Sequence, residues 1–164
     1  MKASEQNKAL TFYWPSPAGP LGLTAEGQAL TRVFFSPAGP AGPPAEAAGG
    51  LFQRAVRQLE EYFAGRRRSF RLPLSPAGTE FQRRVWAALQ DIPYGRTISY
   101  GTLAARAGFP RAFRAAGQAC RRNPLAIIIP CHRVVGRDGR LTGFAGGLDI
   151  KDFLLRLEAG GPGR

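Results

Sequence analysis

The chain has 164 residues, of which 44% are hydrophobic and 10% aromatic, a composition that favours one or two folded cores over disorder. No apolar run approaches the roughly 18 residues that cross a membrane, and no secretory leader is visible, so we expect a cytoplasmic protein with no membrane partner. The net charge of +12, almost all of it from arginine, attracts polyanions and makes nucleic acid the first partner to consider.

The first half of the chain predicts a small α/β domain. Short apolar runs at 10–14, 21–27 and 30–35 are separated by turn residues and indicate hairpins in one sheet. A loop rich in glycine, proline and alanine follows at 36–50. Beyond that loop, apolar residues at helical spacing predict a helix that ends at Gly65.

The stretch 72–78 has the composition of a linker, so we divide the chain into an N-terminal support domain, 1–75, and a C-terminal domain, 76–164. The C-terminal domain opens on a capping-box pattern, because Thr79 is followed three residues later by Gln82. This pattern predicts the start of a helix.

Two helices joined by a glycine turn are predicted next. Ser99 can cap a short helix, Gly108 permits a sharp turn, and a second helix can run from Pro110 to about Arg122. This order of elements is typical of the helix-turn-helix of DNA-binding proteins. We therefore expect a mostly α, winged-helix-like C-terminal domain.

The second of these helices has two faces when residues are placed about 100° apart. The predicted buried face comprises Phe113, Ala116, Gly117 and Cys120. The opposite face comprises Arg111, Arg114, Gln118, Arg121 and Arg122, and a stripe of small residues lies between the two faces. A charged face is most often simply solvated. In a basic chain with a helix-turn-helix pattern, we instead favour contact with DNA phosphates.

The stretch "IIIPCHRVVG", 127–136, places Cys131 and the only histidine of the chain at the end of a predicted buried strand. Pro130 is tolerated at a strand end or edge, so Cys131 should lie where the strand stops. A thiol with a pKa of about 8.5 needs a base or an electropositive setting to act as a nucleophile at neutral pH. His132 could be that base through a water, and Arg133 could supply the positive charge. Glu158, at the half-buried edge of the last predicted helix, is a candidate to orient the imidazole.

A blander interpretation of these residues is that Cys131 is a small buried hydrophobe and His132 lies on the surface. For Cys120 the helical phase favours the buried role. With two cysteines, a disulfide framework is excluded and a zinc site would need an unusual ligand set. We expect free thiols, no metal and no other cofactor.

Around these residues the chain resembles the O6-alkylguanine-DNA alkyltransferases, also called methylated-DNA-protein-cysteine methyltransferases. The resemblance rests on "GTEFQRRVWAALQDIPYGRTISYGTLAARAG", "RAAGQACRRNPLAIIIPCHRVVG" and "GGLDIKDFLLRLE". It implies DNA repair by a monomer without a cofactor, in which the alkyl group of O6-alkylguanine in double-stranded DNA, and also of O4-alkylthymine, moves to a cysteine. It further implies a ribonuclease H-like sandwich for the N-terminal domain.

The resemblance also implies roles for individual residues. Cys131 would accept the alkyl group, His132 would take its proton through a water, Glu158 would hold the imidazole, and Asn123 would brace the turn that presents the cysteine. Because a thioether does not hydrolyse readily, each molecule should act once.

Two further sets of residues follow from the same resemblance, for DNA and for the pocket. Arg114 would fill the gap that the flipped base leaves in the base stack, and Tyr100 would press on the adjacent phosphate. The recognition helix would enter the minor groove. That helix contributes Ala115, Ala116, Gly117, Arg121 and Arg122. The pocket comprises Val134, whose carbonyl would read the guanine amino group, and Phe144 and Ala145, which replace a Tyr-Ser pair common in the family.

Two other functions fit part of the pattern. A DNA-binding regulator whose cysteine only senses alkylation or oxidation would bind DNA in the same way, and stoichiometric methyl transfer to Cys131 would separate the two. A cysteine hydrolase would leave the arginine-rich helix unexplained.

Overall fold

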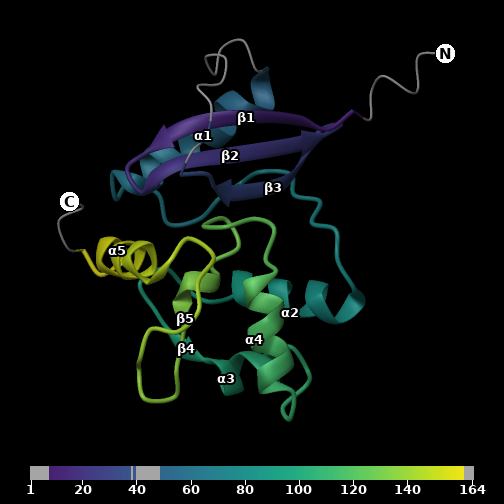
Figure 1. Ribbon diagram of the computed structural model, residues 1–164, viewed down its shortest axis with the longest axis vertical. Coiled ribbons are helices and arrows are strands. Elements are labelled where there is room, and N and C mark those ends of the chain that lie inside the picture. The colour runs from purple at the N-terminus through teal and green to yellow at the C-terminus, as the bar shows by residue number, and fades with distance from the viewer. Residues whose placement is uncertain (1–7, 38, 40–48, 161–164) are drawn as a thin grey trace. The chain divides into compact units, whose positions relative to one another are not determined.

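The structure is a computed structural model that describes residues 8–37, 39 and 49–160. The chain divides into two compact units, Met1–Ala77 and Gly78–Arg164 (Figure 1). Most of the loop predicted at 36–50 lies outside the described residues. In the part of the chain that is described, no helix is long and apolar enough to cross a membrane.

The first unit is an α/β unit, as predicted. Strands β1 (Leu10–Ser16), β2 (Gly19–Glu26) and β3 (Ala29–Phe35) form an antiparallel sheet in that order. Helix α1 (Gly50–Phe63) packs against one face of the sheet (Figure 1), where the rings of Phe12 and Phe52 lie 5.8 Å apart. The hairpins and the helix were therefore predicted correctly.

The stretch predicted to be a linker is partly tied to this sheet. Leu74 forms an isolated parallel bridge with Leu30. The Leu30 N–H donates to the carbonyl of Pro73 at 2.9 Å, and the Ser75 N–H donates to the carbonyl of Leu30 at 2.8 Å. Residues 73–75 therefore belong to the first unit.

The second unit is mostly helical. Its elements, in chain order, are α2 (Glu80–Gln90), β4 (Ile98–Ser99), α3 (Tyr100–Arg106), α4 (Phe113–Arg121), the 3₁₀ helix η2 (Cys131–Arg133), β5 (Val134–Val135) and α5 (Leu148–Glu158). The predicted capping box is confirmed, since Thr79 and Gln82 bond reciprocally at the start of α2. The predicted cap of α3 is confirmed too, because the Ser99 side chain accepts from the Thr102 N–H.

Helices α3 and α4 are joined by residues 107–112, in which Gly108 has a φ of 91°. Helix α4 begins at Phe113 rather than at Pro110, because the Ala112 N–H donates to the Phe109 carbonyl and closes a turn first. On its inner side, α4 is fixed to α2 by a buried hydrogen bond of 2.9 Å from Trp86 Nε1 to the carbonyl of Ala119.

The buried strand predicted before Cys131 is not formed. The Ile128 N–H donates to the Ala126 carbonyl at 2.8 Å and closes a three-residue γ-turn around Ile127. Ile127 has a φ of 70°, a conformation that is rare for a β-branched residue. The apolar run is buried, as a strand would be. Part of its backbone, however, is hydrogen-bonded within its own turns and not to a neighbouring strand.

A second turn of the same kind leads directly into the cysteine. The Cys131 N–H donates to the Ile129 carbonyl at 2.8 Å, around Pro130 with φ −82° and ψ 65°. The chain then enters η2 and pairs through Val134 with Ile98 in the parallel β4–β5 ladder. Cys131 is therefore held at a turn whose two ends are fixed in the second unit.

Candidate active site

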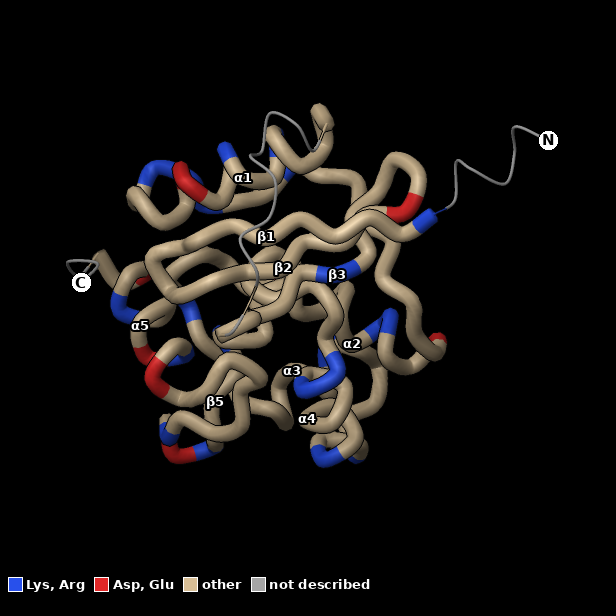
Figure 2. The backbone as a smooth tube through the Cα atoms, turned by 45° about the horizontal axis from the view of Figure 1, so that its top comes forward, with Lys and Arg blue, Asp and Glu red and all other residues tan. Residues whose placement is uncertain are grey.

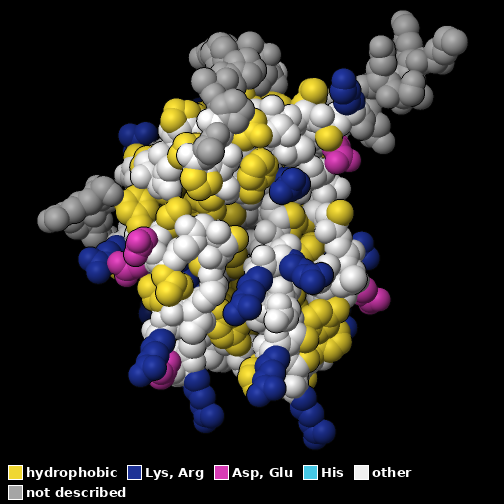
Figure 3. All heavy atoms as spheres, viewed as in Figure 1, with side chains coloured by type: hydrophobic (Ala, Val, Ile, Leu, Met, Phe, Trp, Pro, Cys, Tyr) yellow, Lys and Arg dark blue, Asp and Glu magenta, His cyan; other side chains and the backbone are white. Residues whose placement is uncertain are grey.

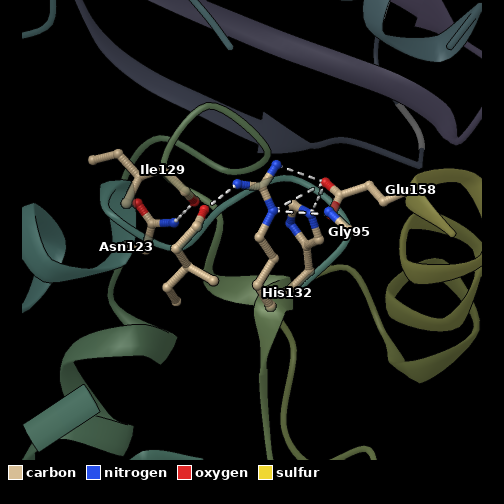
Figure 4. A network of polar contacts seen from close by, with 7 residues as sticks. Gly95, Asn123, Ile129, His132 and Glu158 are labelled. Carbon is tan, nitrogen blue, oxygen red and sulfur yellow. Dashed lines mark hydrogen bonds and ion pairs between the residues drawn. The ribbon is translucent and has the colours of Figure 1, made fainter. Parts of the chain in front are cut away.

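The turn that presents Cys131 is braced by Asn123. The Asn123 side chain donates through Nδ2 to the Ile129 carbonyl at 2.8 Å and accepts at Oδ1 from the Leu125 N–H at 2.9 Å. Figure 4 shows this side chain reaching across the turn to Ile129. Both of its polar ends hold backbone, so the geometry of the turn depends on this amide.

The Cys131 thiol is buried, and burial raises its pKa above the ordinary value. A hydrogen bond from Asn123 and the charge of Lys151 oppose this effect on the pKa only in part. The thiol is therefore protonated at neutral pH, and a nucleophilic reaction needs a base beside it.

His132 and Glu158 form a buried pair. His132 Nε2 lies 2.7 Å from Glu158 Oε1, and the side chains are 0% and 1% exposed (Figure 4). Because Nε2 bonds to a carboxylate, it carries the proton, which leaves the lone pair on Nδ1. His132 Nδ1 is buried and has no hydrogen-bond partner among the described residues. Burial lowers the pKa of His132, against the effect of Glu158, so the imidazole is a neutral acceptor.

Arg133, expected to supply positive charge beside the thiol, belongs to this network through contacts with Glu158 that the sequence did not predict. It donates to Glu158 through Nε, at 2.9 Å from Oε2, and through Nη2, at 2.8 Å from Oε1. It also donates through Nη1 to the Ile92 carbonyl at 2.7 Å. Glu158 also accepts from the Gly95 N–H at 3.3 Å.

This network fixes the ionisation of Glu158. Burial by itself raises the pKa of Glu158, but hydrogen bonds from His132 and Arg133 and the charges of both outweigh it and lower the pKa to about 2. Glu158 is 5% exposed rather than half-buried as predicted, because two cationic or donor side chains close over it. The carboxylate therefore stays charged at neutral pH.

Lys151 was also missed, because a lysine was not expected in the core. Its side chain is 0% exposed, and Nζ donates to the carbonyls of Val134 at 2.6 Å and Thr142 at 2.7 Å. Helix α5 therefore buries Lys151, Leu154, Leu157 and Glu158. Its apolar spacing predicts Leu154 and Leu157 correctly, but it predicts Ile150 and Phe153 in place of Lys151 and Glu158. The Val134 carbonyl keeps a second lone pair that is able to accept from another donor.

The loop that contains Phe144 and Ala145, predicted to form the pocket, lies beside His132. The rings of Phe144 and His132 are 6.5 Å apart and nearly perpendicular, at 81°. Ala145 is exposed. One residue of this loop, Thr142, donates from Oγ1 to the Tyr100 hydroxyl at 3.0 Å, which joins the loop to the start of α3.

Helix α4 places most of the predicted DNA-facing residues at the surface. Arg114, Ala115, Arg121 and Arg122 are exposed and Gly117 is partly exposed. Figure 2 shows basic residues along α4 and in the turn after β5, and in Figure 3 basic side chains project from this unit with hydrophobic atoms between them.

Two predictions on α4 are wrong. Ala116 is 0% exposed, which confirms its place on the buried face and prevents its side chain from contacting DNA. Phe113 is 50% exposed although it was placed on that face. The reason is that the buried face is centred on Ala116, Ala119 and Cys120, where α2 packs through Trp86.

A cavity of about 290 Å³ lies between α4 and the start of α3, and it brings four predicted site residues together, namely Tyr100, Arg114, Gly117 and Arg121. Its lining comprises Tyr100, Phe113, Arg114, Gly117, Gln118, Arg121 and Thr142. Burial raises the pKa of the other cysteine, Cys120, to about 12, so this thiol is protonated at neutral pH. Among the described residues, no cluster of His, Cys, Asp and Glu could hold a metal ion.

Two family models match the chain. Residues 80–160 match the model described as "6-O-methylguanine DNA methyltransferase, DNA binding domain", and residues 10–76 match "6-O-methylguanine DNA methyltransferase, ribonuclease-like domain". A methylated-DNA-protein-cysteine methyltransferase of Methanosarcina barkeri is 62% identical over 107 residues, which are 65% of this chain and 68% of the relative. The protein of the same name from Methanosarcina acetivorans is 61% identical over 107 residues, which are 65% of this chain and 69% of that relative.

Solved structures agree with this result. The O6-methylguanine methyltransferase of Mycobacterium tuberculosis is 44% identical, with a TM-score of 0.81 over 93% of this chain and 94% of the other. The structure of Mycobacterium tuberculosis OGT in complex with DNA is 45% identical, with a TM-score of 0.81 over 90% of this chain and 91% of the other. With both of its units matched, and with a buried cysteine beside a neutral histidine, this chain belongs to the methylated-DNA-protein-cysteine methyltransferase family.

Proposed function

We propose that Cys131 is the alkyl acceptor of this methyltransferase, and that each molecule removes one alkyl group from O6-alkylguanine in double-stranded DNA. O4-alkylthymine is the second substrate in this proposal. The observation that carries it is the buried Nδ1 of His132, which has no hydrogen-bond partner among the described residues and belongs to the residue directly after a buried thiol. Such an arrangement supplies a base where a protonated thiol needs one.

The reaction follows from these groups. His132 Nδ1 takes the thiol proton through a water while Glu158 holds the ring through Nε2. Sulfur then attacks the alkyl carbon, the bond from carbon to O6 breaks with its electron pair going to guanine, and a proton restores neutral guanine. The carbon–sulfur bond is a thioether, so the protein is not regenerated.

The direct test is intact-mass and peptide mass spectrometry after incubation with a duplex that contains O6-methylguanine. We expect a gain of one methyl group per molecule, located on Cys131. A protein that binds the duplex and gains no methyl would be a regulator, and the proposal would be abandoned.

DNA recognition is assigned to α3 and α4. In this proposal they form the helix-turn-helix, α4 lies in the minor groove, Arg114 replaces the flipped base, and Tyr100 contacts the adjacent phosphate. The exposure of Arg114 and the missing side chain at Gly117 support it, because both permit close approach of DNA. We further propose that 76–164 is sufficient for the chemistry, that 1–75 supports it, and that the protein acts as a monomer in the cytoplasm.

Replacing Arg114 by alanine should slow repair of methylated duplex by about 100-fold, because unstacking a base costs a few kcal/mol that the arginine offsets by filling the gap. The reaction with free O6-alkylguanine should hardly change, since a free base needs no flipping. Second-order rate constants of the parent and of Arg114→Ala, measured on methylated duplex and on free O6-alkylguanine, give the two losses to be compared.

The matched control is Arg122→Ala, which removes an exposed arginine that lies outside the cavity. It should weaken binding to all sequences and reduce the salt dependence. Equal losses on duplex and free base for Arg114→Ala would show a damaged pocket, and the role of this residue in flipping would be withdrawn.

The pH dependence of the reaction with free base should report His132. A base must be neutral to accept a proton, and burial lowers the pKa of His132 below its ordinary value of about 6.5. We therefore expect a constant rate from about pH 8 down to 6.5 and a decline only below that range. Stopped-time alkylation assays at each pH, with circular dichroism to confirm folding, measure it. A midpoint above pH 7 would contradict the neutral imidazole.

A further inference from the structure

Phe113 is an exposed aromatic residue that the proposed function leaves without a role. Among the described residues, the large hydrophobic side chains with high exposure are Leu10 at 57%, Phe113 at 50% and Leu148 at 47%. Single exposed apolar residues are ordinary on protein surfaces. Phe113 differs from the other two because it lies directly before Arg114 and lines two cavities.

The position of Phe113 on α4 gives its ring open space. Phe113, Gly117 and Arg121 lie four residues apart, on one side of the helix, and all three line the cavity of about 290 Å³. Gly117 has no side chain, so the space one turn from the ring stays open. A second cavity, of about 550 Å³, is lined by Phe113 and Tyr100 together with Ser99, Gly101, Thr102 and Arg137.

The charges around the ring indicate what it could bind. The Arg114 guanidinium carbon lies 5.8 Å from the centre of the Phe113 ring. Arg121 and Arg137 line the two cavities, and none of the described lining residues is acidic. An apolar ring surrounded by guanidinium groups fits a ligand with flat apolar faces and a phosphate backbone, and fits a lipid chain or an apolar peptide poorly.

We propose that Phe113 is a second wedge, whose ring enters the minor groove beside Arg114 and stacks on a base left without a neighbour when the alkylated guanine leaves the helix. This inference rests on the proposed function and adds to it a residue that touches the DNA. Stacked duplex offers no free base face. The ring therefore binds the flipped state more strongly than the stacked state and favours flipping.

The test compares Phe113→Ala with Phe113→Trp. The alanine variant should repair methylated duplex about tenfold more slowly, the scale of one lost stack between a base and an aromatic ring, and should react with free O6-alkylguanine at the parent rate. The tryptophan variant keeps an aromatic face and should retain most of the duplex rate. Leu148→Ala, which removes a similarly exposed apolar side chain from α5, should match the parent on both substrates.

Salt dependence separates a wedge from a phosphate contact. Phe113→Ala should keep the parent slope of the logarithm of the DNA-binding constant against the logarithm of salt concentration, whereas Arg122→Ala should reduce the size of that slope by about 1. The inference is overturned by a parent duplex rate in Phe113→Ala, by equal losses on duplex and free base, or by a reduced salt slope in that variant. Failure of the proposed function shows elsewhere, as a parent protein that gains no methyl group.

Discussion

Replacement of Cys131 by alanine is expected to abolish alkyl transfer while leaving DNA binding at the parent level. The variant removes one buried sulfur and leaves the exposed residues of α4 unchanged. Alanine is preferred to serine here, because a buried hydroxyl without a partner would add a desolvation cost of its own. Transfer of labelled methyl from duplex to protein, together with a binding isotherm, measures both parts of the result.

The matched control is Cys120→Ala, since Cys120 is the other buried free thiol of the chain. Burial raises the pKa of Cys120 to about 12, and this side chain lies on the inner face of α4. We expect that variant to transfer the alkyl group normally. Substantial labelling of protein in Cys131→Ala would assign the acceptor to another residue.

Glu158→Gln is expected to lower the rate by about 10² to 10⁴, the usual contribution of general base assistance, on duplex and on free base alike. Glutamine cannot hold the imidazole with a charge, so the ring loses both orientation and basicity. The same change leaves Arg133 buried without its counter-ion, and breaking such a pair typically costs about 3–5 kcal/mol of folding stability. Rates should therefore be measured at a temperature where circular dichroism shows the variant to be folded.

Asp152→Asn is the control for this experiment. It removes a carboxylate of the same helix that pairs with Arg156 at 2.7 Å on the exposed surface, where ion pairs contribute little. We expect its rate and stability to match those of the parent. If Glu158→Gln reacted with free base at the parent rate, Glu158 would have no part in activating His132.

Local sequence signals predicted the parts of this fold that depend on local interactions. The capping box at Thr79 and the cap at Ser99 each depend on residues within one turn of the chain. The pairing of His132 with Glu158 could be anticipated because one histidine and one half-apolar helix edge left few alternatives.

The missed features depend on partners far along the chain. Lys151 is buried because carbonyls of Val134 and Thr142 accept hydrogen bonds from its ammonium group, whereas helical spacing alone places a lysine at the surface. Three isoleucines predict burial equally well for a strand or for turns, and the periodicity cannot distinguish them. The exposure of Phe113 depends on where α2 packs against α4, which no local pattern contains.

The conformation of Ile127 limits where the chemistry can occur. A β-branched residue at a φ of 70° keeps that shape only while the surrounding fold imposes it. A free peptide with the same residues, or an unfolded copy of the chain, would relax to an extended backbone and would present the thiol of Cys131 without its turn, its amide brace or its base. In the proposed mechanism, the capacity to accept an alkyl group is thus a property of the folded unit, so each molecule would keep its single reaction until it has reached the native state.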